Sequence, residues 1–154
     1  MQAISLTQPR ALRLVEIPEP QVGPEDVLIG LHYVGLCGSD LSAYRGQMPL
    51  LSYPRILGHE LSGTILAKGA RVSERVRLGA RVMASPYSEC GLCPACRAGR
   101  PNCCEFNETL GVQRDGALTQ RIALDYRKVY ASDVLTDEEL ALVEPLSVGY
   151  HACN

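Results

Sequence analysis

The sequence predicts a mainly β fold with short helices and one loop-rich lobe. Short runs of β-branched and aliphatic residues recur along the chain, and the strongest of them covers Asp26–Val34. Glycine and proline separate these runs, as they commonly do between strands. Several cysteines gather in residues 88–107, a stretch that is otherwise rich in Gly, Pro and Asn. With 154 residues, the chain has the size of one domain.

Most of the expected elements are strands. They are predicted at Ala11–Ile17, Asp26–Val34, Leu61–Leu66, Ala80–Ala84 and Ala117–Ala123. Between the second and third of these, residues 35–40 contain two glycines that permit tight backbone geometry. Ser39 or Asp40 is then expected to cap a short helix that ends near Tyr44.

Two helices are expected near the C-terminal end. Thr136 is followed by acidic residues at 137–139, which is the pattern of an N-cap, and this helix should end near Val143. Glu144 and Pro145 then open a second helix, because proline is favoured at the start of a helix. The sequence contains neither a GxGxxG dinucleotide motif nor a P-loop.

The composition argues against several classes of function. The formal net charge is −2, so the chain offers no basic field to nucleic acid or to anionic lipid. The N-terminus lacks the basic and apolar regions of a secretory signal, and no apolar run approaches the roughly 18 residues of a membrane helix. We therefore expect a cytoplasmic protein that binds neither nucleic acid nor membrane.

The cysteine-rich stretch has the spacing C-x2-C-x2-C-x7-C, formed by Cys90, Cys93, Cys96 and Cys104. In a reducing compartment such a cluster is more often a metal site than a set of disulfides. Four thiolates close the tetrahedral shell of zinc, which is typical of a structural site. A redox dithiol and two disulfides are the alternatives. Cys103 lies beside Cys104, and spacing alone does not decide which of the two would bind.

Metal-binding residue types also occur on three other segments, as Cys37, the pair His59 and Glu60, and Glu144. Each has an ordinary explanation when it is taken alone. A single cysteine is usually a small core residue, a single histidine is usually a hydrogen-bonded polar group, and a glutamate before proline usually lies on a solvated helix start. Their order along the chain, however, suggests a joint explanation.

The motif Gly58-His59-Glu60-x-x-Gly63-x5-Gly69-x-x-Val72 resembles the signature of the zinc-containing medium-chain alcohol dehydrogenases. Cys37-Gly-Ser-Asp40 precedes it and the cysteine-rich stretch follows it, in the order found in that family. The resemblance covers essentially the whole chain. It implies a GroES-like catalytic domain, which is a partly open β-barrel, with one catalytic and one structural zinc.

By this resemblance, Cys37 and His59 are ligands of the catalytic zinc, and Glu144 stands where ethanol-type members have a third cysteine. A glutamate at that place resembles the polyol and threonine dehydrogenase branches. Glu60 would lie beside the metal and bind it directly or through water. The structural zinc would be held by Cys90, Cys93, Cys96 and Cys104, and the resemblance thus favours Cys104 over Cys103.

The resemblance also implies roles for three residues near Cys37. Ser39 occupies the position of the hydroxyl that hydrogen-bonds the substrate alcohol. Asp40 would accept a hydrogen bond from His59 and so orient it, as metal-bound imidazoles generally require. Many members carry a histidine of the proton relay five residues after the cysteine ligand, where this chain has Ser42. The relay is then expected to run through Ser42 and water, or by another route.

Three short stretches, Ser52–Glu60, Gly99–Glu105 and Gly111–Gly116, resemble bacterial sugar-acid oxidoreductases of the L-galactonate or L-gulonate 5-dehydrogenase type. A hexonate carboxylate could pair with Arg45, Arg55 or Arg114, although we favour the explanation that all three are surface residues. His32 and His151 match no ligand motif, so we expect both to be structural.

The resemblance implies zinc- and nicotinamide-dependent oxidation of a secondary alcohol, a polyol or a sugar acid, to a ketone. A threonine or butanediol dehydrogenase and a non-catalytic zinc-stabilised interaction module are the alternatives. Residues 1–144 would form the catalytic domain, and residues 145–154 would begin the helix that leads to a nucleotide-binding Rossmann domain, which the sequence lacks. We expect two zinc ions per chain, NAD or NADP and a small-molecule substrate in a homo-oligomeric parent enzyme, and no activity of the fragment alone.

Overall fold

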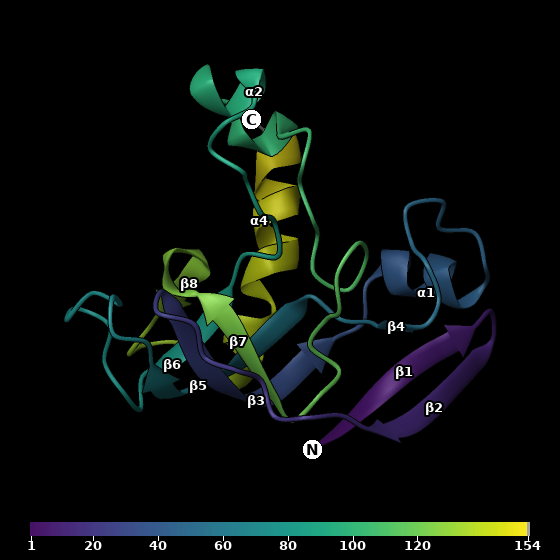
Figure 1. Cartoon of the computed structure of the whole chain (residues 1–154), viewed down its shortest axis with the longest axis horizontal. Coiled ribbons are helices and arrows are strands. Elements are labelled where there is room, and N and C mark those ends of the chain that lie inside the picture. Colours follow the sequence, from purple (N-terminus) through teal and green to yellow (C-terminus); the bar gives the residue numbers. More distant parts are fainter. Residues whose placement is uncertain (154) are drawn as a thin grey trace.

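The computed structural model describes residues 1–153, which form two antiparallel sheets, short helices and a cysteine-rich lobe (Figure 1). The first sheet has the strand order β2 (Ala11–Glu16), β1 (Gln2–Gln8) and β4 (Arg55–Ile56). The second has the order β7 (Arg121–Asp125), β3 (Asp26–Gly35), β5 (Glu60–Lys68), β6 (Arg81–Ala84) and β8 (Val129–Ala131). Neither sheet closes on itself, so the fold is mainly β and partly open, as predicted.

The helices are short and lie between or beyond the strands. They are α1 (Gly38–Tyr44), α2 (Pro94–Arg97), α3 (Asp137–Ala141) and α4 (Val143–Ala152), with 3-10 turns at Pro101–Cys103 and Tyr126–Lys128. Helix α4 extends away from the sheets in Figure 1. Within residues 1–153, none of these helices combines the length and the apolar character that crossing a membrane requires.

Strand β3 lies inside the five-stranded sheet, because β7 pairs with its first half and β5, the central strand, pairs along its length. Val27 and Ile29 on β3 are fully buried and pack in the main core with Leu61 and Ile65 of β5. Full burial of such a side chain contributes about 1.5–3 kcal/mol. A second core around Leu6 joins the three-stranded sheet to α1.

Several predicted elements are confirmed. The strands expected at Ala11–Ile17, Asp26–Val34, Leu61–Leu66 and Ala80–Ala84 agree with β2, β3, β5 and β6, apart from small shifts at their ends. The predicted N-cap of α3 is also present. The Thr136 hydroxyl accepts a hydrogen bond from Glu139 N at 3.2 Å, and the Glu139 carboxylate accepts one from Thr136 N at 2.8 Å. The last helix begins at Val143, close to its predicted start.

The predicted strand at Ala117–Ala123 was wrong in its first half. Strand β7 begins only at Arg121, because the preceding backbone bonds elsewhere. Ala117 N donates to Gly58 O and Leu118 N donates to Leu57 O, both at 2.9 Å. This segment therefore lies against the loop that leads to His59 instead of extending the five-stranded sheet.

The predicted cap of α1 was also wrong. The helix begins at Gly38, and Cys37 occupies the N-cap position, one or two residues before the expected Ser39 or Asp40. Asp40 lies in the first turn and accepts a hydrogen bond from Cys37 N. The Asp40 carboxylate thus pairs with the backbone N–H of the N-cap residue, as in a capping box.

Gly116→Ala should destabilise the fold, because a Cβ atom there would lie 2.4 Å from Gly58 O and 2.5 Å from Leu57 O. Backbone atoms have no rotamer that could yield, so we expect the free energy of unfolding to fall by about 1–3 kcal/mol. Gly149→Ala in α4 is the control, since its Cβ would meet no atom within 4 Å. Denaturant titration compares the two variants, and equal stability would contradict the packing described.

Candidate metal centres

The structure brings Cys37, His59 and Glu60 together. One ligand atom from each residue lies within 4.8 Å of the other two. Cys37 directly precedes α1, His59 ends the loop before β5, and Glu60 is the first residue of β5. Thiolate, imidazole and carboxylate are all ligands of zinc, so this group, the open cluster, has the donor set of a zinc site.

Asp40 ties together the two loops that carry the open cluster. Its Oδ2 accepts a hydrogen bond from Cys37 N at 2.9 Å, and its Oδ1 accepts one from Gly58 N at 3.3 Å. Asp40 is only 5% exposed, so water competes little for these bonds. We expected Asp40 to accept a hydrogen bond from His59. The structure instead places its carboxylate on the backbone of Cys37 and of the residue before His59.

Glycines provide the space in which the open cluster forms. Gly58 has a φ of +91°, in the left-handed region that favours glycine, and Gly111 and Gly116 pack on its backbone. Gly35 faces Glu60 across the β3–β5 pairing. A Cβ atom at Gly35 would lie 2.3 Å from Glu60 Oε2, so the carboxylate occupies room that any other residue would remove.

His59 fits the role of a metal ligand. The residue is buried, and its Nδ1 atom has no hydrogen-bond partner. No hydrogen bond found within residues 1–153 involves either nitrogen of the ring. An unpaired buried polar group costs about 1–3 kcal/mol, so a fold that keeps one usually has a use for it. The imidazole therefore has a nitrogen free for a metal ion.

Glu144 lies beside the open cluster without belonging to its compact group. It is in the first turn of α4 and is buried, although a glutamate before proline is usually solvated. The pKa of Glu144 is raised above its ordinary value, mainly because the carboxyl is buried. The charge of His59 and the hydrogen bond from Tyr87 lower this pKa, whereas the charge of Glu60 raises it. Helix α4, which carries Glu144, packs against β5, whose first residue is Glu60, and the charges of His59 and Glu60 both act on this carboxyl.

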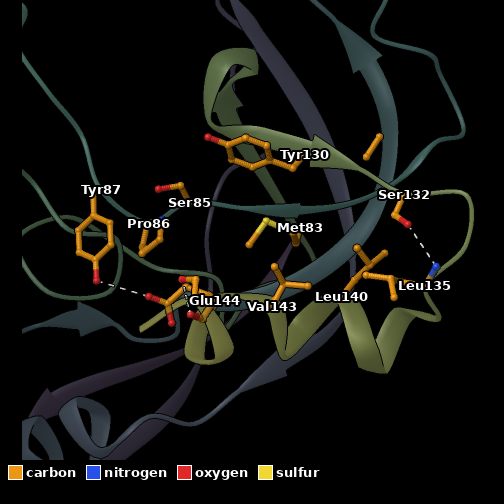
Figure 2. Close-up of a pocket in the computed structure, with 12 residues that line it drawn as sticks. Met83, Ser85, Pro86, Tyr87, Tyr130, Ser132, Leu135, Leu140, Val143 and Glu144 are labelled. Atoms are coloured by element: carbon orange, nitrogen blue, oxygen red, sulfur yellow. Dashed lines mark hydrogen bonds between the residues drawn. The ribbon is translucent and has the colours of Figure 1, made fainter. Parts of the chain in front are cut away.

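Tyr87 is a site residue that the sequence did not indicate. Its hydroxyl donates to Glu144 Oε1 at 3.4 Å, and Figure 2 shows the ring directed at that carboxylate. Burial, followed by the charge of Glu144, raises the pKa of Tyr87. Both residues lie at one end of a cavity of about 470 Å³, which has the size of a small-molecule site. Ser132 and Leu135 lie at its other end (Figure 2).

The two serines near Cys37 have different environments. Ser39 Oγ is buried and has no hydrogen-bond partner within residues 1–153. Ser42 Oγ donates to Gly38 O at 3.0 Å, one helical turn back. The predicted relay through Ser42 thus has no direct hydrogen bond between the two hydroxyls. Water would have to connect them.

The cysteine-rich lobe contains a second metal-binding group, the closed cluster. Its members are Cys90, Cys93, Cys96 and Cys104, whose Sγ atoms all lie within 4.8 Å of one another. Backbone amides surround the sulfurs: Cys93 N donates to Cys90 Sγ at 3.3 Å and Phe106 N to Cys104 Sγ at 3.3 Å. Cys103 is exposed and stands apart, so the geometry assigns the fourth position to Cys104.

The backbone amides favour thiolates at part of the closed cluster. Hydrogen bonds from Cys96 N and Glu105 N lower the pKa of Cys93 to about 6. The amides of Leu92 and Cys93 lower the pKa of Cys90 in the same way. Burial and the neighbouring Cys93 raise the pKa of Cys96 to about 12. Thiolate is the form that binds zinc, so the lobe is prepared for a cation at its centre.

The remaining candidate residues lie outside both clusters. His32 Nδ1 is 2.9 Å from Asp137 Oδ2, which fits the predicted structural role, whereas His151 is exposed on α4. Arg55 pairs with Asp115 at 3.2 Å. Arg45 is exposed, and Arg114 is half-buried, which lowers its pKa.

The comparisons with known proteins find dehydrogenases. The sequence model of the family described as "Alcohol dehydrogenase GroES-like domain" matches residues 23–134. An uncharacterized zinc-type alcohol dehydrogenase-like protein of Haemophilus influenzae is 42% identical, and the alignment covers 100% of this chain and 45% of that protein. L-galactonate-5-dehydrogenase of Escherichia coli is 36% identical, with 99% and 44% covered.

A solved structure has a fold similar to that of this chain. The short chain alcohol dehydrogenase from Escherichia coli CFT073, complexed with the cofactor NADH, superposes with a TM-score of 0.89. It is 32% identical, and the match covers 97% of this chain and 44% of that one. The chain therefore spans somewhat less than half the length of the relatives that it matches.

Cys93→Ser should release the metal of the lobe, because a structural zinc needs all four thiolates and contributes folding free energy. Cys103→Ser is the matched control, since Cys103 lies outside the closed cluster. Zinc per chain and melting temperature should fall in Cys93→Ser and stay unchanged in Cys103→Ser. Equal zinc content in the two variants would refute the assignment of the closed cluster.

Tyr87→Phe should weaken zinc binding at the open cluster mainly at acidic pH. Tyr87 donates to the Glu144 carboxylate and lowers its pKa, so loss of the hydroxyl raises that pKa and leaves less carboxylate at low pH. We expect a loss of about two- to fivefold in affinity, the scale of one modest hydrogen bond. The difference should vanish as the pH rises and Glu144 ionises in both proteins.

Chelator competition across a pH series measures this effect. Tyr130→Phe is the control, because Tyr130 lines the same cavity and forms no hydrogen bond through its hydroxyl within residues 1–153. A Tyr87→Phe defect that grows with pH, or that Tyr130→Phe reproduces, would contradict the role given to Tyr87.

Proposed function

Because the chain belongs to the alcohol dehydrogenase GroES-like domain family, we propose that it supplies the zinc-holding and alcohol-binding part of a nicotinamide-dependent dehydrogenase. The reaction is the oxidation of a secondary alcohol, in a polyol or a sugar acid, to a ketone. The observation that carries the proposal is the convergence of Cys37, His59 and Glu60. Glu144 adds a fourth donor from a separate element.

In this proposal Cys37, His59, Glu60 and Glu144 surround one zinc ion. Zinc bound there would lower the pKa of a hydroxyl group presented to it. Cys37 and Glu144 together carry the two negative charges that balance a divalent cation. Glu60 would add a third, so its distance from the metal tunes how strongly the hydroxyl is polarised. The Glu60 carboxylate fills the space that Gly35 leaves, so a side chain at position 35 would displace it.

Ser39 accepts the proton of the alcohol at its Oγ atom. Two observations support this role: Ser39 follows the ligand Cys37 by two residues, and its hydroxyl is buried without a partner. The proton then passes to solvent, either through water and Ser42 or by another route. The carbon that bears the hydroxyl loses two electrons, and NAD or NADP is the acceptor. We place the cofactor-binding domain in the part of the whole protein that corresponds to the unmatched length of the relatives.

A polyol or a sugar acid is the substrate class that the relatives support. The Escherichia coli relative at 36% identity is named for L-galactonate, a sugar acid. The cavity that Tyr87 and Glu144 line also presents serine side chains, to which a substrate rich in hydroxyls would hydrogen-bond. The whole protein would act as a homo-oligomer.

A panel of polyols, hexonates and amino alcohols, offered to the whole protein with NAD and with NADP, tests this proposal. Zinc-dependent turnover of a polyol or a hexonate, abolished in Cys37→Ala, is the expected result. Turnover confined to amino alcohols would move the chain to the threonine dehydrogenase alternative. Zinc binding without turnover of any alcohol would favour a non-catalytic module.

Ser39→Ala should slow the whole enzyme by about 10²- to 10⁴-fold in kcat while zinc content stays unchanged, which is the scale of general acid–base assistance. Ser42→Ala should cost less, because the Ser42 hydroxyl already donates to Gly38 O. Rates measured against pH, together with zinc analysis, compare the two variants. Full activity in zinc-loaded Ser39→Ala would mean that the proton leaves by another path.

A further inference from the structure

Strand β3 contains a bulge at His32. Leu31 pairs with Gly63 and Tyr33 with Ser62, so two steps along β3 match one step along β5. Paired residues point to the same face of a sheet, and neighbours along a strand point to opposite faces. Tyr33 therefore points away from the face of Leu31 and joins His32 on the other face. A regular strand would have separated these two neighbouring side chains.

Both side chains bind the first turn of α3. His32 Nδ1 lies 2.9 Å from Asp137 Oδ2, and the Tyr33 hydroxyl donates to Glu138 Oε1 at 2.6 Å. His32 Nε2 also lies 3.4 Å from the Thr64 hydroxyl on β5. We call this arrangement the β3 clip. It joins two successive carboxylates of α3 to two adjacent strands of the sheet.

The β3 clip is not needed to form the helix itself. Thr136 and Glu139 already cap α3 reciprocally, and acidic residues in a first turn are favoured by the helix dipole. The hydrogen bonds of the clip lie at the surface, where such pairs add little to stability. What they add is a fixed position of α3 relative to β3 and β5.

Helix α3 is directly followed in the chain by α4, the helix that carries Glu144. Leu140 and Ala141 of α3 are buried, and the helix packs against β3, β5 and β6. Leu142 alone separates α3 from α4, and Glu144 follows in the first turn of α4. A shift at the clip would therefore be transmitted to the Glu144 carboxylate over a few residues of continuous backbone.

We propose that His32 and Tyr33 are positioning residues for Glu144: through the bulge in β3 they hold α3, and α3 holds this carboxylate beside the metal position. The inference rests on the proposed function, because it requires Glu144 to act as a metal ligand. His32 thereby acquires a role beyond the structural one expected from the sequence. Neither residue touches the metal position itself.

Cobalt(II) binding at the open cluster tests this inference in the whole protein, with zinc retained in the lobe as an internal control. The double variant His32→Leu/Tyr33→Phe should bind cobalt about tenfold more weakly, the lower end of the range for residues that orient metal ligands. The lobe should keep its zinc. His32→Asn, which retains a side-chain donor, should restore most of the loss that His32→Leu alone causes. Tyr130→Phe should have no effect.

A double-mutant cycle with Glu144→Gln decides whether the β3 clip acts through Glu144. Glu144→Gln alone should weaken cobalt binding, and adding the clip variants to it should cause no further loss. If Glu144→Gln weakens binding and the clip variants do not, the positioning role is wrong and the proposed function stands. If the clip variants lower the melting temperature and weaken both clusters alike, the clip is only structural.

If Glu144→Gln itself leaves cobalt affinity unchanged, then Glu144 is not a ligand, and both the assignment of Glu144 and the positioning role are overturned. If the losses from the clip variants and from Glu144→Gln add fully, the clip acts by a route other than Glu144, and the inference is likewise overturned. Each outcome is read from metal affinity and melting temperature, without any need for turnover.

Discussion

The two hydrogen bonds of the Asp40 carboxylate are the constraint on which the open cluster depends. Cys37 and His59 lie on separate loops at the end of the β3–β5 pairing, and a connection between those loops fixes their side chains at one point. Asp40 provides it by binding Cys37 N and Gly58 N with its two oxygens, while also completing the start of α1. The backbone of Gly58 is held from its other side by the segment around Gly116.

Electrostatics explain why this arrangement suits a divalent cation. Burial raises the pKa of Glu144, the charge of His59 lowers it and that of Glu60 raises it again, while His59 Nδ1 has no hydrogen-bond partner. Without a cation, the burial of these donors costs free energy that no attraction between opposite charges offsets. In the lobe, four sulfurs gather in the same way, and backbone amides donate hydrogen bonds to them. The two clusters differ in that four thiolates complete a coordination shell, whereas Cys37 of the open cluster also lines a cavity.

The sequence was sufficient where a local pattern determines the structure. The β-rich run of β3 and the capping residues around Thr136 predicted their elements, and the C-x2-C-x2-C-x7-C spacing predicted the four sulfurs that converge. It was insufficient where distant backbone segments compete. The segment after Gly116 forms hydrogen bonds with the Gly58 loop instead of a strand. Asp40 accepts hydrogen bonds from backbone amides instead of from His59. The bulge at His32 depends on how β3 pairs with β5. Tyr87 has no motif of its own, so only the position of α4 reveals its partner Glu144.

Zinc K-edge X-ray absorption of the zinc-loaded chain tests the central claim, that one chain holds two zinc sites of different chemistry. A four-thiolate site alone gives only Zn–S distances of about 2.3 Å, whereas an imidazole and carboxylates add Zn–N and Zn–O distances of about 2.0–2.2 Å. We predict a mixed shell in which sulfur dominates and nitrogen or oxygen also contributes. A shell of sulfur alone at full zinc loading would show that Cys37, His59, Glu60 and Glu144 hold no metal, and would contradict the account given for the open cluster.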